Sequence, residues 1–114
     1  MAYDAQIRIL HDYFSLGVDD YPWQVLLENE SPELENEARK EIGKEHPLFG
    51  MNLTALAKCE QNSEALFAMD DGYYTLIHLT HKEENDRRKP RFTLFENFGG
   101  ALDYIRTEFP FADF

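Results

Sequence analysis

Three side chains in the second half of the sequence have the chemistry for nucleophilic catalysis: Cys59, His78 and Thr80. A thiol becomes a strong nucleophile when an imidazole lies close enough to take its proton. On a strand His78 and Thr80 share one face, whereas His81 points the opposite way, so the two histidines cannot converge on one metal. A small enzyme or ligand-binding domain that uses Cys59, His78 and Thr80 is therefore one hypothesis. The alternative is a buried cysteine and a hydrogen-bonded or exposed histidine at a strand end.

Short motifs of catalysis and cofactor binding are missing from the sequence. It has no phosphate-binding loop, no G-x-G-x-x-G, no H-E-x-x-H and no G-x-S-x-G. Its one cysteine permits neither an internal disulfide nor a cysteine-based metal cluster. Carboxylates are numerous, but no window has the spacing of an EF-hand loop around a central glycine. We therefore expect no catalytic residues, no cofactor and no metal site.

Acidic residues outnumber basic ones two to one. The 114 residues include 22 Asp and Glu but 11 Lys and Arg, which gives a net charge of −11. A field of this sign repels nucleic acids and anionic membrane surfaces and attracts basic proteins. The one basic cluster is Arg87, Arg88, Lys89 and Arg91. Because acids share its segment, we expect a solvated loop there rather than a nucleic-acid site.

The acids are concentrated toward the N-terminal half, in a segment with no Lys or Arg between its first and last acid. Spaced carboxylates pair well with Lys and Arg. Tyr21 and Trp23 lie among them, and aromatic anchors within a polar rim are typical of protein interfaces. The alternative is a solvated helix face with pairs such as Glu35 and Arg39. The predicted partner-binding residues are Asp19, Asp20, Tyr21, Trp23, Glu28, Glu30, Glu33, Glu35 and Glu37, with Asp70 and Asp71 as a second patch.

Helices are the first elements that must position these residues. Apolar side chains recur at helical spacing from Asp4 to about Leu16 and predict a helix there. Pro22 suits the start of a short helix or turn that holds Trp23. The clearest helix start is at Ser31, which can cap the first turn while Pro32 takes the first helical position.

Strand patterns dominate after residue 50. Strands and then a final helix are expected over residues 53–58, 65–69, 73–80, 91–95 and 98–108. Asp71-Gly72 is a two-residue hairpin signal, in which Asp70 pairs with Tyr73 and Phe67 lies opposite Leu76. Both faces of that hairpin are apolar, so helices must cover one face, and the chain or a partner must cover part of the other.

The order of these elements predicts a single α+β domain over residues 1–114. It would contain N-terminal helices, a mainly antiparallel sheet of three to four strands and a C-terminal helix. Nothing at the N-terminus resembles a secretory signal, and no stretch reaches membrane-spanning length. A lone cysteine fits a reducing compartment, so we expect a cytoplasmic protein.

A resemblance to known proteins adds to these expectations. The segment ALFAMDDGYYTLIHLT from Ala65 to Thr80, followed by RFTLF at Arg91–Phe95, resembles a pattern in small bacterial proteins. In length, charge, lack of catalytic motifs and α+β layout, the whole chain resembles the small acidic immunity proteins of bacterial toxin systems, including contact-dependent inhibition. The resemblance implies one-to-one neutralisation of a basic toxin, often a nuclease. It implies that the protein covers the toxin's active site or docks beside it.

The leading hypothesis is therefore an immunity protein or antitoxin that blocks a basic toxin domain. We expect a monomer or a 1:1 heterocomplex rather than a homo-oligomer, with no direct nucleic-acid binding and no membrane association. Two other hypotheses are the enzyme or ligand-binding domain described above and a self-associating adaptor that uses an uncovered sheet face.

Overall fold

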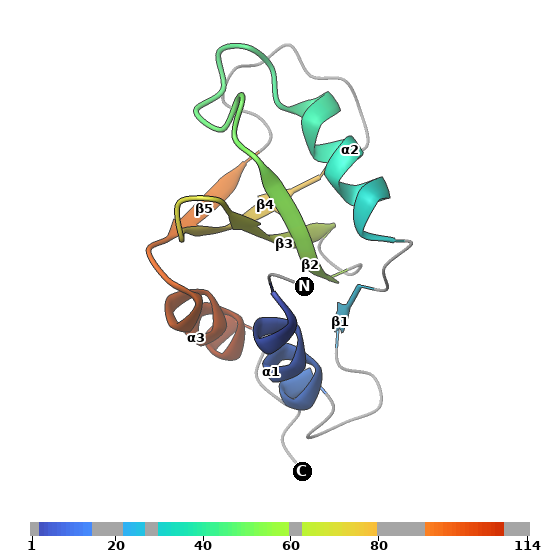
Figure 1. Ribbon diagram of the computed structural model, residues 1–114, viewed down its shortest axis with the longest axis vertical. Coiled ribbons are helices and arrows are strands. Elements are labelled where there is room, and N and C mark those ends of the chain that lie inside the picture. The colour runs from blue at the N-terminus through green and yellow to red at the C-terminus, as the bar shows by residue number, and fades with distance from the viewer. Residues whose placement is uncertain (1–2, 15–21, 27–29, 60–62, 80–90, 109–114) are drawn as a thin grey trace.

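A computed structural model describes residues 3–14, 22–26, 30–59, 63–79 and 91–108 of the chain (Figure 1). It confirms the α+β class, with helices at both ends of the sequence and an antiparallel sheet. The sheet has five strands, one more than the upper limit expected from the sequence. In chain order the elements are α1 (Asp4–Phe14), β1 (Trp23–Val25), α2 (Ser31–Glu41), β2 (Leu53–Cys59), β3 (Glu64–Met69), β4 (Tyr74–His78), β5 (Phe92–Phe95) and α3 (Phe98–Glu108).

The five strands form a meander in which each strand pairs with its neighbour in the sequence, in the order β1-β2-β3-β4-β5. The additional strand is β1, where the sequence favoured a short helix or turn around Trp23. That expectation is wrong because Trp23 pairs with Cys59 and Val25 pairs with Ala57 of β2. Pairing with a neighbouring strand thus overrides the local signal of Pro22, which lies just before β1.

The β3–β4 hairpin has a three-residue loop instead of the expected two-residue turn. The Met69 amide donates to the Tyr73 carbonyl (2.8 Å), and the Gly72 amide donates to the Met69 carbonyl (3.1 Å). Gly72 has a φ of +89°, the left-handed geometry that closes such loops. The expected register is therefore wrong by one residue: Phe67 pairs with Thr75, not with Leu76.

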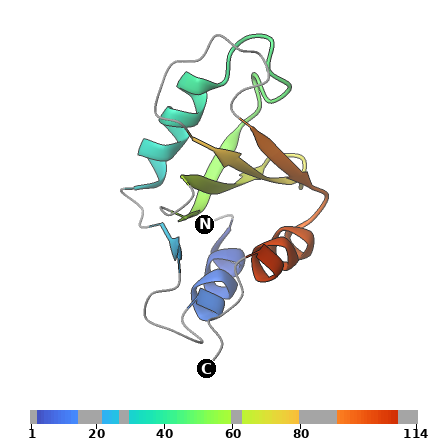
Figure 2. The same ribbon diagram turned by 180° about the vertical axis from the view of Figure 1, so that it is seen from behind.

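Helices cover both faces of the sheet, on opposite sides of it in Figures 1 and 2. On one face α1 and α3 bury Leu10 and Ile105 against Leu66 and Leu76. On the other face α2 and the segment after it bury side chains against the alternate residues of the strands, among them Ala38, Ile42, Leu48, Phe67 and Ile77. The expectation that both faces are apolar and need cover is confirmed, and this chain supplies the cover.

The helices α2 and α3 differ in how they begin. In α3 the Asn97 side chain accepts a hydrogen bond from the Gly100 amide (2.8 Å), which caps the helix despite its two glycines. In α2 the cap residue is Glu30 and no side chain caps the helix, so the expected cap at Ser31 is wrong. None of the described helices has the length and apolar composition of a membrane-spanning segment.

Candidate protein-binding surface

The predicted acidic surface includes acids of α2 and of the residue just before it, and these lie within the described residues. Glu35 Oε2 accepts a hydrogen bond from the Ala55 amide at 2.9 Å. The Ser31 hydroxyl donates to the carbonyl of the same residue at 3.1 Å. A register shift interrupts β2 between Ala55 and Ala57, where the pairing with β1 ends. Two side chains of α2 thus satisfy backbone groups of β2 that no strand partner takes.

Glu30 and Glu37 also have partners within the chain. Glu30 Oε2 lies 3.1 Å from Lys58 Nζ, and both side chains are partly buried. Glu37 Oε1 lies 3.8 Å from Lys40 Nζ, three residues along the helix. The Glu35–Arg39 pair considered from the sequence is not formed, since Glu35 bonds to β2 and Arg39 donates to Asn36. Of the predicted α2 acids, Glu33 is the exposed one.

The remaining members of the predicted N-terminal surface lie outside the described residues, except for Trp23. Asp19, Asp20, Tyr21 and Glu28 lie outside the described residues. Trp23 is only 1% exposed and packs against the Phe14 ring, with ring centroids 6.3 Å apart. The prediction of a surface anchor at Trp23 is therefore wrong, because β1 places this side chain in the core under α1.

The second predicted patch, Asp70 and Asp71, lies at the tip of the β3–β4 hairpin, and both residues are exposed. Asp70 Oδ2 accepts a hydrogen bond from the Asn52 side chain at 2.6 Å. Asp71 Oδ1 accepts one from the Tyr73 amide at 3.1 Å, within its own turn. Burial, and after it the charge of Asp70, raises the pKa of Tyr3. Within the described residues neither aspartate forms an ion pair with a Lys or Arg.

Exposed apolar side chains lie beside these two aspartates. Tyr73 is 36% exposed, Leu94 is 46% exposed and Met51 is 37% exposed. Leu94 pairs with Thr75, two residues beyond Tyr73, so Tyr73 and Leu94 lie diagonally on one face of neighbouring chain segments. Met51 directly precedes Asn52, which bonds to Asp70. With the exposed Glu96, these residues form the hairpin-tip surface: Met51, Asp70, Asp71, Tyr73, Leu94 and Glu96.

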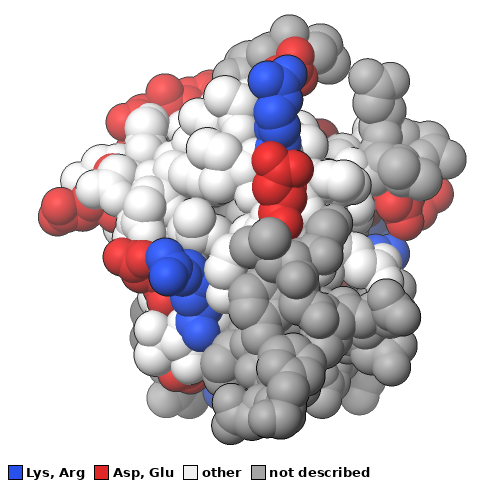
Figure 3. Space-filling view, turned by 90° about the horizontal axis from the view of Figure 1, so that it is seen from below, with Lys and Arg blue, Asp and Glu red and all other residues white. Residues whose placement is uncertain are grey.

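On another side of the molecule, several acids lie beside basic residues. Figure 3 views the molecule from the side of α1 and α3, and the basic side chains visible there lie next to acidic ones. Arg106 and Asp103 of α3, for example, lie 3.8 Å apart. Of the predicted basic cluster, Arg91 is exposed just before β5, and Arg87, Arg88 and Lys89 lie outside the described residues. The hairpin-tip surface thus differs from these pairs by its acids without basic partners.

The two described residues of the catalytic hypothesis, Cys59 and His78, do not converge. Cys59 pairs with Glu64, and Glu64 pairs with His78, so Glu64 lies between the thiol and the imidazole on three adjacent strands. Two strand spacings separate Cys59 from His78 by roughly 10 Å, too far for proton transfer between them. Thr80 lies outside the described residues. The structure therefore provides no nucleophile and base pair from Cys59 and His78.

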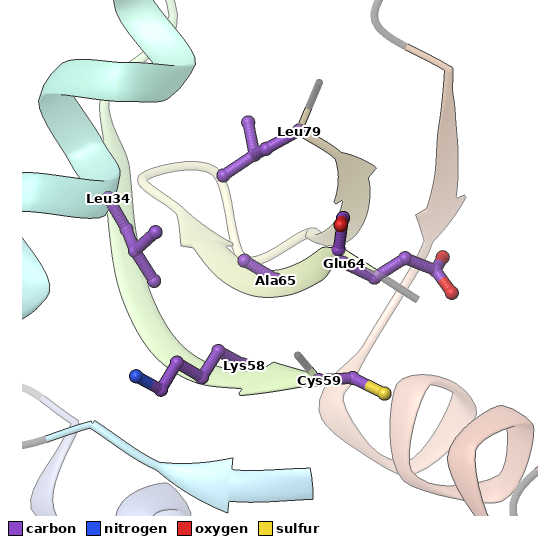
Figure 4. A pocket seen from close by; sticks show the side chains of 7 residues that line it. Leu34, Lys58, Cys59, Glu64, Ala65 and Leu79 are labelled. Carbon is purple, nitrogen blue, oxygen red and sulfur yellow. The ribbon is translucent and has the colours of Figure 1, made fainter. Parts of the chain in front are cut away.

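A small pocket of about 140 Å³ lies next to Cys59. Figure 4 shows Cys59 and Glu64 pointing to one side of the sheet and Lys58 pointing to the other. His78 does not line the pocket, whose residues are Leu34, Lys58, Cys59, Ser63, Glu64, Ala65 and Leu79. Within the described part of the chain, no three His, Cys, Asp or Glu residues are grouped to hold a metal ion. The pocket therefore has neither the imidazole nor the ligand set that the catalytic hypothesis needs.

Comparisons with protein-family models, with curated proteins and with solved structures gave no match to this chain. The geometry and charge of the chain itself are therefore the basis for its function. The candidate binding site is the hairpin-tip surface. The sequence predicted two of its members, Asp70 and Asp71. Tyr73 and Leu94 were missed because their exposure depends on the hairpin register and on the position of β5 at the edge of the sheet.

Proposed function

We propose that this protein binds a basic partner protein through the hairpin-tip surface and neutralises it, as an immunity protein or antitoxin does. The observation that supports the proposal is a cluster of exposed apolar side chains bordered by three acids, Asp70, Asp71 and Glu96, that lack basic partners in the described residues. The proposed partner is a toxin domain, with nucleases as the first class to test. In this proposal the protein is not an enzyme, needs no cofactor and works in the cytoplasm.

The two components of the surface would contribute differently to binding. Apolar side chains such as Tyr73 and Leu94 gain free energy when a partner removes them from water, at about 25 cal/mol for each Å² of apolar surface. Unpaired carboxylates attract a basic surface over a distance and mainly raise the association rate. A partner that offers Lys or Arg around an apolar centre would satisfy both requirements. A nuclease domain, whose substrate-binding surface is basic, has that character.

The net charge of −11 also bears on stoichiometry. Two copies of the chain repel each other, whereas a basic partner reduces the charge of the complex. A monomer that forms a 1:1 heterocomplex is therefore the proposed state. The same field disfavours direct binding to nucleic acid or to an anionic membrane.

The proposal is tested by reversing the charge of the three acids in the variant Asp70→Lys, Asp71→Lys, Glu96→Lys. Binding is measured to the toxin domain encoded beside the gene for this chain, by calorimetry at low and at high salt. We expect the triple variant to bind at least about a hundredfold more weakly, since each rim acid contributes on the order of 1 kcal/mol. Its remaining affinity should also depend less on salt, because fewer ion pairs form.

The matched control reverses three exposed acids elsewhere, in the variant Asp12→Lys, Glu33→Lys, Asp103→Lys. It changes the net charge by the same amount but leaves the hairpin-tip surface intact. We expect it to slow association modestly and to keep most of the affinity. If both variants lose the same affinity, the total charge and not this surface determines binding. If neither variant changes the affinity or its salt dependence, the proposal is wrong.

A further inference from the structure

The strand β5 forms one edge of the sheet, and its hydrogen-bonding pattern shows which backbone groups face away from β4. The His78 amide donates to the Arg91 carbonyl at 2.9 Å. Hydrogen-bonded pairs alternate along antiparallel strands, so Thr93 and Phe95 also direct their backbone groups toward β4. The amides and carbonyls of Phe92 and Leu94 then point away from the sheet. No strand among the described residues lies beyond β5 to receive them.

This edge is short, at four residues, but it lacks three other features that usually prevent pairing with another chain. Edge strands are commonly blunted by an inward or central charge, a proline or a bulge. The strand Phe92–Phe95 contains only Phe, Thr and Leu, and its pairing with β4 is regular. Charges occur only outside its ends, at Arg91 and Glu96.

The opposite edge of the sheet is protected differently. There β1 has only three residues and directly follows a proline, Pro22. Beyond its end, Ser31 and Glu35 occupy the backbone groups of Ala55. The contrast shows that this chain covers open strand groups at one edge with side chains of α2, while the described residues show no such cover at β5.

We infer that the β5 edge accepts an extended, basic segment of the partner as a sixth strand. The inference rests on the proposed function, because the charge of the surroundings selects the occupant. Glu96 follows the strand, and Asp70 and Asp71 lie at the tip of the adjacent hairpin, all without basic partners in the described residues. A second copy would bring the same acids and a charge of −11 to the same edge, which opposes self-pairing.

The two faces of β5 indicate which side chains the added strand should carry. On one face Leu94 is 46% exposed and Tyr73 lies diagonally from it, which suits an apolar side chain at alternate positions. On the other face Tyr104 of α3 packs against Phe95, with ring centroids 5.4 Å apart. Lys or Arg at the intervening positions would be attracted by the net negative charge of the chain and by Asp70, Asp71 and Glu96. A segment that alternates apolar and basic residues therefore fits the edge.

The test uses an acetylated and amidated octapeptide of alternating Lys and Val, titrated into the isotopically labelled full-length protein and followed by NMR. We expect saturable binding that high salt weakens, with slowed hydrogen exchange at the Phe92 and Leu94 amides. A peptide of alternating Glu and Val serves as the charge control and should not bind. Binding with no change at those two amides overturns the edge inference but leaves the proposed function standing.

The variant Leu94→Pro removes an outward amide, and proline is tolerated in an edge strand where the amide faces away from its neighbour. This variant should bind the Lys-Val peptide about tenfold or more weakly. Leu94→Ala, which keeps the amide, should bind it about threefold more weakly. Thr93→Pro removes an amide that faces β4 and should unfold part of the sheet. If Leu94→Pro and Leu94→Ala bind alike, the backbone of the edge is not used.

A second measurement leaves the protein unchanged. The Lys-Val peptide is N-methylated at alternate residues, which removes its donors on one edge and keeps its charge and side chains. We expect at least a tenfold loss on methylation of the edge that would face β5, and little effect on the other. Equal binding by all three peptides overturns the inference. So does a stable homodimer in sedimentation that Leu94→Pro dissociates, because the edge would then belong to a second copy.

Discussion

The hydrogen bond from the Ala55 amide to Glu35 gives the sharpest test of how this chain uses its acids. The bond spans 2.9 Å and joins the first half of α2 to the interrupted part of β2. The variant Glu35→Ala removes the acceptor and leaves a partly buried amide without its protein partner. The Ser31 hydroxyl still holds the carbonyl of the same residue, so the segment should stay folded.

The expected cost follows from the kind of bond that is lost. Removing a partner from a buried amide costs about 1–3 kcal/mol, and a charged acceptor places the bond toward the upper end. The site is only partly buried, so water can replace part of the interaction. We therefore expect Glu35→Ala to lower the free energy of unfolding by about 1–2 kcal/mol. For a domain of this size that corresponds to a fall in melting temperature of roughly 4–8 °C.

Calorimetry or chemical denaturation followed by circular dichroism measures this loss. Glu35→Gln keeps an oxygen acceptor and should recover about half of it. Glu33→Ala is the matched control, because Glu33 is exposed on the same helix, and it should change stability by less than about 0.5 kcal/mol. Equal stability of Glu35→Ala and Glu33→Ala would refute the reasoning. Glu35 would then be, like Glu33, an acid that is available to bind a partner.

Three other outcomes are expected. Gly72→Ala should lower the free energy of unfolding by about 1 kcal/mol, measured by denaturation. An added Cβ would meet no atom within 4 Å, but the φ of +89° disfavours any side chain. Gly43→Ala, at an equally open site, should lower it less. Burial, and then nearby carboxylates, raises the pKa values of Tyr3 and Tyr104 above 10.0 in the folded protein. The contribution of these two tyrosines to the free energy of unfolding is fully present below about pH 10 and is lost as the pH rises through their raised pKa values. Tyr3→Phe and Tyr104→Phe should therefore reduce the loss of stability at alkaline pH. Cys59, which is buried, should react with a thiol reagent at the rate of unfolding, and rapid labelling of the native protein would contradict its placement in the core.

Local patterns in the sequence were sufficient to predict most of the elements and the α+β class. The final helix was expected over residues 98–108, as observed, and the strands of the second half differ from expectation by one or two residues at their ends. The errors occur where long-range contacts decide. Trp23 has no alternating context of its own, and it becomes part of a strand because β2 pairs with it. The hairpin register depends on whether Gly72 closes a two-residue or a three-residue loop, and Asp71-Gly72 fits both.

The candidate surface was harder to predict, because a sequence does not show which acids form hydrogen bonds or ion pairs within the folded protein. Glu30 and Glu35 looked equivalent to Asp70 and Asp71 as acidic surface residues. The structure separates them: Lys58 pairs with Glu30, the Ala55 amide bonds to Glu35, and the two aspartates remain exposed at a turn. Only a tertiary structure shows these partners, since Lys58 is 28 residues away from Glu30 in the sequence.

The way the sheet is covered also limits where a partner can bind. Because α1 and α3 cover one face and α2 covers the other, a macromolecule cannot reach the central strands without displacing a helix. Displacement would expose core side chains such as Phe67 and Leu66, each worth on the order of 2 kcal/mol when buried. Within the described residues, the hairpin tip and the β5 edge can be reached without that cost. Three of the five large exposed apolar side chains of the described residues, Met51, Tyr73 and Leu94, lie with exposed acids at this end of the sheet. Binding there therefore explains the observations more simply than binding at a face.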